Sequence, residues 1–207
     1  MAEDALDVVV VGAVGIDTNV FVGGGTLDLT VEGHFAENLD CVGQAGGYAS
    51  RGYARLGHRT ALIGAVGDDP CGQWVRTTLA ADGIATLFVV DPRGTNRSVN
   101  LMLRDGQRRS FYDAKSAMEI CPDLAACRAL LARARLAHIN IQHWCRHLLA
   151  PAREFGCTVA VDLQDVRTLD DPYRADFVTA ADILFFSASH FPDPAPAIEY
   201  YLSVGSP

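Results

Sequence analysis

The sequence predicts an α/β protein with a mainly parallel sheet flanked by helices. Short β-branched apolar runs recur along the chain, they alternate with helical patterns after residue 123, and short links join them. A parallel sheet covered on both faces is the arrangement that buries such strands. The 207 residues, 49% of them hydrophobic, suffice for one sizeable domain, so we expect a single domain over residues 1–207.

The first strand is expected at 7–11, a β-branched run too short for a helix. Gly12 to Asp17 follows with G-x-x-G spacing, and 18–23 continues as strand. A dinucleotide site needs G-x-G-x-x-G leading into a helix. The sequence therefore argues against an NAD enzyme.

Two strand-rich segments predict a second, smaller sheet. Residues 18–45 contain two or three short strands, including the alternating segment 27–33 and a piece near 38–42. A hairpin over 98–113 turns at Asp105-Gly106. We interpret 18–45 and 97–114 as a lid over a ligand, with an ordinary edge hairpin as the alternative for the second.

The stretch 43–67 organises the chain. It predicts a glycine-rich loop, a helix from about Tyr48 and a strand over 60–66. Gly46 and Gly47 leave backbone N–H groups open to a ligand at the helix start. The alternative is that these glycines serve only close packing.

The remaining elements continue the α/β alternation. The expected helices are 71–82, 124–135, 145–156, 171–181 and one from Ile198; the expected strands are 86–90, 136–141, 157–163 and 181–189. In the first of these helices we expect Trp74, Val75, Thr78 and Leu79 to face inward. Ligands of such sheets gather at the carboxyl ends of the strands. The candidates there are Asp17, Gln142, His143, Asp162, Gln164 and Ser187.

Composition excludes several classes of partner. The formal charge of −8 disfavours nucleic acid and anionic membranes, and no apolar run approaches the ~20 residues of a membrane span. The acidic start is no signal peptide, and six scattered cysteines indicate reduced thiols, so we expect a cytoplasmic protein. His143 and His147 lack acidic partners at ligand spacing, so no metal site is expected. Arg104, Arg108 and Arg109 flank the hairpin turn, where a solvated turn is favoured over contact with a substrate phosphate.

Two segments carry a resemblance to a known family. AGGYASRGYARLG followed by ALIGAVGDDPCG, after a first strand, Asp17 and lid strands, resembles the ribokinase-like (PfkB) carbohydrate kinases. The resemblance spans nearly the whole chain but only about the first two thirds of such a kinase. It implies a mainly parallel sheet with a β-strand lid that often mediates dimerisation, and hence a possible homodimer. It also implies ATP and Mg²⁺ as cofactors and a sugar or nucleoside as phosphoryl acceptor.

The resemblance also implies residue roles. Asp17 matches the carboxylate that binds sugar hydroxyls, and Gly46 and Gly47 match the glycines that line the sugar site. Tyr48 stands where the family usually has asparagine; it could stack on a sugar ring, donate from its hydroxyl, or merely pack. His143, at a strand end, could face the ligand cleft.

The nucleotide half departs from the family. Asp162-Leu-Gln164 only partly matches Asp-x-Asn, and Ser187 to His190 replaces the Asn-x-x-Glu that organises magnesium and phosphate. The Gly-Ala-Gly-Asp segment, whose aspartate is the catalytic base, does not occur, so no catalytic residue is assigned. We expect a truncated or natural short form with the C-terminal part of the fold absent, inactive alone. The alternative is a non-catalytic sugar- or nucleoside-binding or scaffold protein with the kinase fold.

Overall fold

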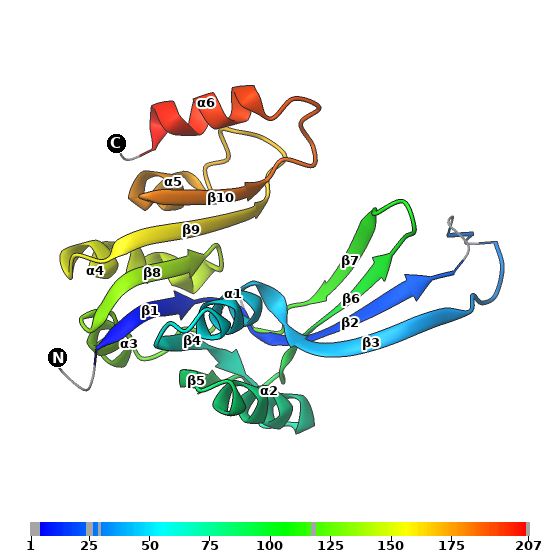
Figure 1. Ribbon diagram of the computed structural model, residues 1–207, viewed down its shortest axis with the longest axis horizontal. Helices are drawn as coiled ribbons and strands as arrows, with labels where there is room; N and C mark the ends of the chain where they lie inside the picture. Colours follow the sequence, from blue (N-terminus) through cyan, green and yellow to red (C-terminus); the bar gives the residue numbers. More distant parts are fainter. Residues whose placement is uncertain (1–4, 24–26, 29, 117–118, 206–207) are drawn as a thin grey trace.

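The protein contains two sheets of different character (Figure 1). The computed structural model describes residues 5–23, 27–28, 30–116 and 119–205. The central sheet is six-stranded and parallel, in the order β10-β9-β8-β1-β4-β5. Its strands are β1 Leu6–Val11, β4 Thr60–Val66, β5 Ala85–Val90, β8 Ala134–Asn140, β9 Thr158–Asp165 and β10 Ile183–Ser187. The predicted fold class is confirmed.

Helices cover both faces of this sheet. They are α1 Gln44–Arg55, α2 Pro70–Ala81, α3 Leu124–Leu131, the 3-10 helix η1 His143–Leu148, α4 Leu149–Glu154, α5 Ala175–Ala180 and α6 Ala195–Val204. Val8 and Val10 of β1 belong to the apolar cluster on the side of α1 and α2, whereas Val9 and Val11 point to the opposite face, into the cluster that also includes residues of α3 to α6. The alternation of side chains along β1 thus joins two apolar cores through one strand.

The second sheet, which we call the lid sheet, has the order β3-β2-β6-β7. It consists of β2 Gly15–Val22, β3 Ala36–Gly43, β6 Asn96–Met102 and β7 Arg108–Asp113. β2 pairs antiparallel with β3 and parallel with β6, and β6 and β7 form the predicted hairpin. Figure 1 shows the lid sheet extending away from the carboxyl ends of the central strands.

Two carboxylates fasten the ends of the β6–β7 hairpin to the central domain. Asp69, the N-cap of α2, accepts from the N–H and the hydroxyl of Thr95, both at 2.7 Å. Asp91, just after β5, accepts from the N–H of Ser116 at 2.9 Å and from its hydroxyl at 2.8 Å. Entry to and exit from the hairpin are therefore held by side chains of the central domain.

Several local predictions were wrong. The segment 27–33 forms no strand at its described residues, and residue 29 lies outside them. The expected helix over 124–135 ends at Leu131, because Ala134 pairs with Leu6 in the sheet. Backbone pairing overrides the helix propensity there.

Two further helices differ from expectation. The expected helix over 145–156 is divided into η1 and α4, and the one over 171–181 begins only at Ala175. In α2, Val75 and Leu79 are buried as predicted, but Trp74 is 41% exposed, because one residue along a helix turns the side chain by about 100°. Among the described residues, no helix combines the length and apolar content of a membrane span.

Candidate functional site

Asp17 lies where the lid sheet meets the carboxyl end of β1. It is the third residue of β2, and only residues 12–14 separate the two strands. Its neighbours across the lid strands are Cys41 on β3 and Ser98 on β6. The side chain is 4% exposed, so its carboxylate needs partners inside the protein.

Gln44, the first residue of α1, supplies those partners. Its side-chain Nε2 donates to Asp17 Oδ1 at 2.8 Å and to Ser98 Oγ at 2.5 Å, and its backbone N–H donates to Asp17 Oδ2 at 3.1 Å. Its φ of +67° is uncommon for a residue other than glycine. Gln44 thus ties the lid sheet to α1 and fixes the orientation of the Asp17 carboxylate. Sequence reasoning missed it, because this bridge depends on two strands far apart in the chain.

Tyr48 stands beside the same carboxylate. Its hydroxyl lies 3.2 Å from Cys41 Sγ, and its side chain is half exposed. A Cβ on Gly43 would come within 2.4 Å of Asp17 Oδ2 and 2.7 Å of the Tyr48 hydroxyl, so only glycine lets these groups approach. Burial, and then the contacts with Cys41 and Asp17, raise the pKa of Tyr48 above its ordinary value. The hydroxyl therefore remains a hydrogen-bond donor at neutral pH.

Gly46 and Gly47 lie in the first turn of α1 instead of in a loop. The helix begins at Gln44, before the expected Tyr48, and the N–H groups of both glycines donate to the carbonyl of Ala13, at 2.8 and 3.1 Å. A Cβ on Gly46 would lie 2.8 Å from that carbonyl oxygen. These N–H groups are therefore used within the protein, and the glycines allow α1 to pack against the β1–β2 link. Whether the glycines also line a sugar site stays a prediction.

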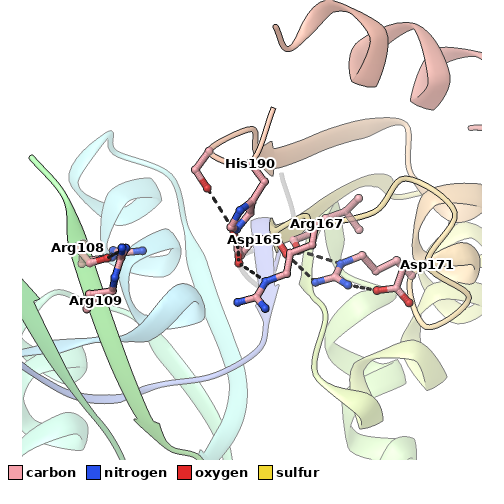
Figure 2. A network of polar contacts seen from close by, with 9 residues as sticks. Arg108, Arg109, Asp165, Arg167, Asp171 and His190 are labelled. Atoms are coloured by element: carbon pink, nitrogen blue, oxygen red, sulfur yellow. Dashed lines mark hydrogen bonds and ion pairs between the residues drawn. The ribbon is translucent and has the colours of Figure 1, made fainter. Parts of the chain in front are cut away.

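A second polar group lies at the carboxyl ends of β9 and β10 (Figure 2). His190 Nε2 lies 2.9 Å from Asp165 Oδ1, and Ser189 and Arg167 also contact this carboxylate. Burial alone raises the pKa of Asp165, but the bonds from His190, Arg167 and Ser189 outweigh it, so the pKa lies below its ordinary value. Ser187 is the strand partner of Asp165 and is exposed.

Asp162 and Gln164 occupy a tight bend beside this group. Asp162 Oδ1 accepts from the backbone N–H of Gln164 at 2.8 Å, and Gln164 has a φ of +57°. Of the predicted phosphate-region residues, His190 contacts Asp165 and Ser187 is its strand partner, whereas Asp162 and Gln164 contact each other. The sequence did not single out Asp165.

The histidines are placed apart from Asp17. The ring of His143 faces His147 and Tyr173, in η1 and the segment before α5. His138 is buried, and the Tyr53 hydroxyl lies 3.2 Å from its Nδ1; burial lowers the pKa of His138, while Asp162 opposes this. In the part of the chain that the structure describes, no group of three or more His, Cys, Asp or Glu side chains could hold a metal ion.

The hairpin arginines stand away from the Asp165 group. Figure 2 shows Arg108 and Arg109 on one side and Asp165, Arg167 and His190 on the other. Both hairpin side chains are exposed, and Arg109 donates to the Arg108 carbonyl at 3.3 Å. This placement fits a solvated turn better than a contact with the second polar group.

Asn140 is a buried polar residue that sequence reasoning missed. It ends β8 with no exposed surface, and neither its Oδ1 nor its Nδ2 has a hydrogen-bond partner among the described residues. A Cβ on Gly12 would come within 1.9 Å of its Oδ1, so the amide lies directly against the end of β1. Buried amides normally have a partner. The only sequence signal is a polar residue inside the apolar run 136–141.

Known proteins share this architecture. A model of the family described as pfkB family carbohydrate kinase matches residues 5–188. The acarbose 7(IV)-phosphotransferase of Actinoplanes sp. is 31% identical over 202 residues, which cover 96% of this chain and 67% of that protein. A solved microbiome-derived acarbose kinase is 33% identical with a TM-score of 0.84, covering 97% of this chain and 67% of the other.

A more distant structure shows the fold alone. Ribokinase from Arabidopsis thaliana, complexed with ribose and ATP, has a TM-score of 0.70 at 19% identity, covering 98% of this chain and 70% of that one. The chain therefore spans about two thirds of the length of these relatives. Their two-sheet architecture and the family match confirm the resemblance found in the sequence. The chain belongs to the pfkB family of carbohydrate kinases.

Proposed function

We propose that this chain binds a sugar or nucleoside through Asp17, as the acceptor-binding part of a kinase that phosphorylates a hydroxyl of that acceptor from ATP. The observation that carries the proposal is the oriented carboxylate at the junction of the lid and central sheets. An ionised carboxylate has about four lone-pair positions, and Gln44 uses two of them, so the others can accept from hydroxyl groups and orient a polyol. Two relatives above 30% identity are named for acarbose, so acarbose is the first acceptor to test, before ribose and fructose.

The surrounding residues support this assignment. Gln44 fixes the carboxylate, and Tyr48 offers a protonated hydroxyl and a half-exposed ring on which a sugar face can stack. Gly46 and Gly47 bring α1 close to the β1–β2 link. His143 lies on a different element, so we give it no direct part in acceptor binding.

The residues at the ends of β9 and β10 do not fit a magnesium site. Asp165 is paired with His190 and also contacts Arg167, and Asp162 Oδ1 accepts from the N–H of Gln164, so only Asp162 keeps an oxygen outside these contacts. Magnesium is usually held by one or two free carboxylates together with phosphate oxygens. We therefore derive no catalytic step through Mg²⁺ or ATP. Because the 207 residues contain no Gly-Ala-Gly-Asp segment, we expect acceptor binding without turnover from this chain alone.

A non-catalytic sugar-binding protein is the second candidate. The segment Ser187 to His190 lacks the carboxylate that the family's Asn-x-x-Glu supplies, and its His190 pairs with Asp165. A coupled assay of ADP formation separates the two candidates. Turnover of acceptor and ATP by the full-length protein supports the kinase, and acceptor binding without turnover by the same full-length protein supports the binding protein.

The face of the lid sheet that points away from Asp17 carries exposed apolar side chains, which support the possible homodimer. Val99 and Phe111 are direct strand partners on that face, and they are 40% and 63% exposed. Exposed apolar side chains of this kind often mark an interface. Dimerisation and a cytoplasmic location both stay predictions.

The decisive test is Asp17→Asn, measured by titration calorimetry with acarbose, ribose and fructose. We expect acceptor binding to weaken by about 1–3 kcal/mol, the scale of a hydrogen bond to a charged group. Asp40→Asn is the matched control, because Asp40 is an exposed carboxylate on the same sheet. Unchanged affinity of Asp17→Asn would assign Asp17 a purely structural part.

A further inference from the structure

A row of polar side chains crosses the lid sheet next to Asp17. Asn100 Nδ2 donates to Asn19 Oδ1 at 3.1 Å, and Ser110 Oγ donates to Asn100 Oδ1 at 2.7 Å. These three residues come from β2, β6 and β7, where they are direct strand partners. We call Asn19, Asn100 and Ser110 the amide row.

The strand register puts the amide row on the same face as Asp17. Residues two apart along a strand share a face, and so do direct strand partners. Asn19 follows Asp17 by two residues on β2, and Asn100 follows Ser98 by two residues on β6. The amide row is therefore displaced from Asp17 by about 7 Å, the rise of two strand residues, toward the outer end of the lid, so it lies beyond a ring that Asp17 would hold.

The amide row retains hydrogen-bonding capacity. Each amide nitrogen carries two hydrogens, and Asn100 Nδ2 uses one of them on Asn19. Asn19 Nδ2 has only a 3.6 Å contact with Cys41 Sγ, a weak acceptor. Asn19 and Ser110 are half-buried, so they are both positioned and reachable, whereas Asn100 is buried and holds the other two in place.

Aromatic side chains flank the amide row on both sides. Tyr112 is the strand partner of Ser98 and is 68% exposed; Phe21, two residues beyond Asn19, is 42% exposed. Amides and a hydroxyl between exposed aromatic rings are the chemistry that holds a sugar, because hydroxyl groups pair with the amides and ring faces stack on the aromatics. This grouping could not be predicted from the sequence, because its members lie up to 91 residues apart, from Asn19 to Ser110.

We propose that the amide row is a second carbohydrate subsite, which binds the sugar ring next to the one held by Asp17. The protein then prefers an oligosaccharide or other glycoside to a free monosaccharide. This inference rests on the proposed function, because Asp17 must hold the first ring. The half-exposed Phe21 marks the outer end of the subsite.

The test measures the affinities of the 207-residue chain for acarbose, maltotriose, glucose and ribose by titration calorimetry. The variants are Asn19→Ala, Ser110→Ala and their combination. We expect the double variant to weaken oligosaccharide binding roughly tenfold, the scale of one or two lost hydrogen bonds, and to leave monosaccharide binding unchanged. Asn38→Ala is the matched control, because Asn38 is an exposed asparagine on the opposite face of the sheet.

The outcomes separate this inference from the proposed function. A ratio of oligosaccharide to monosaccharide affinity that falls only in the amide-row variants supports the second subsite. If wild-type protein binds both classes equally, or the double variant weakens both equally, the subsite is overturned while Asp17→Asn still reports on the first site. If wild-type protein binds none of the four sugars, the subsite is overturned, and titration with a nucleoside then decides whether the proposed function falls with it. Thermal melting of each variant shows that it folds.

Discussion

The lid junction and the β9–β10 side of the molecule are held together by different forces. At the junction, buried polar groups bond to one another: Asp17 to Gln44, and Asp91 to Ser116. On the β9–β10 side, the interior is apolar around Phe177, and polar groups such as Asp165 and His190 lie at the surface. Hydrogen bonds demand one geometry, whereas apolar contacts tolerate small shifts. The junction therefore has the more strictly defined geometry, which suits the acceptor site proposed there.

The largest expected effect comes from truncating a side chain in the apolar interior of the β9–β10 side. Phe177→Ala removes a side chain with no exposed surface, and we expect the free energy of unfolding to fall by about 3–5 kcal/mol. Phe185→Ala, on the exposed face of β10, should cost far less. Urea unfolding checks both. Similar losses for the two variants would contradict an apolar interior centred on Phe177.

A glycine of the junction should give the next effect. Gly46→Ala places a Cβ 2.8 Å from the Ala13 carbonyl, a backbone group that cannot move alone, and we expect a loss of about 1–3 kcal/mol in unfolding free energy. Gly52→Ala is the control on the same helix, with nothing within 4 Å of the new Cβ. It should stabilise by about 0.5–1 kcal/mol, because alanine favours a helix interior. Equal behaviour of the two variants in thermal unfolding would show that the close packing of α1 is unimportant.

The smallest expected effect is on the pH dependence of the unfolding free energy, through the hydrogen bonds of Asp91 to Ser116. Burial alone raises the pKa of Asp91, but the N–H groups of Arg93 and Ser116 and the Ser116 hydroxyl outweigh it, so the pKa lies below its ordinary value. A lowered pKa means that the stabilisation is complete above about pH 4, the ordinary aspartate value, and is lost as pH falls through the folded-state value. Asp91→Asn should cost about 1 kcal/mol at pH 7 and flatten the acid limb of a plot of unfolding free energy against pH. Asp105→Asn, in the exposed hairpin turn, is the control for replacing a surface aspartate by asparagine.

The sequence predicted what depends on local patterns. The central strands follow from apolar runs such as 60–66, and the hairpin follows from Asp105-Gly106 between alternating strands. Asp17 was predicted as a candidate because it follows the first strand, and its part in binding stays a prediction. These features are encoded within a few neighbouring residues.

What the sequence could not show depends on register and close approach. Gln44 reaches Ser98 across 54 residues, and its positive φ has no signature in the residue type. The amide row exists only because β2, β6 and β7 pair in one register. The early start of α1 likewise follows from the bonds of Gly46 and Gly47 to Ala13, which no helix propensity contains.

The position of Asp17 in a lid strand has a mechanical consequence. Residues 12–14 form a short link between β1 and β2, and Asp17 lies close to this link. Phe21 lies further from this link on the same strand. A tilt of the lid sheet about this link would displace Phe21 further than Asn19, and Asn19 further than Asp17. In the two sugar sites proposed above, a ring held by Asp17 would therefore keep its contacts better than a ring at the outer end of the lid sheet.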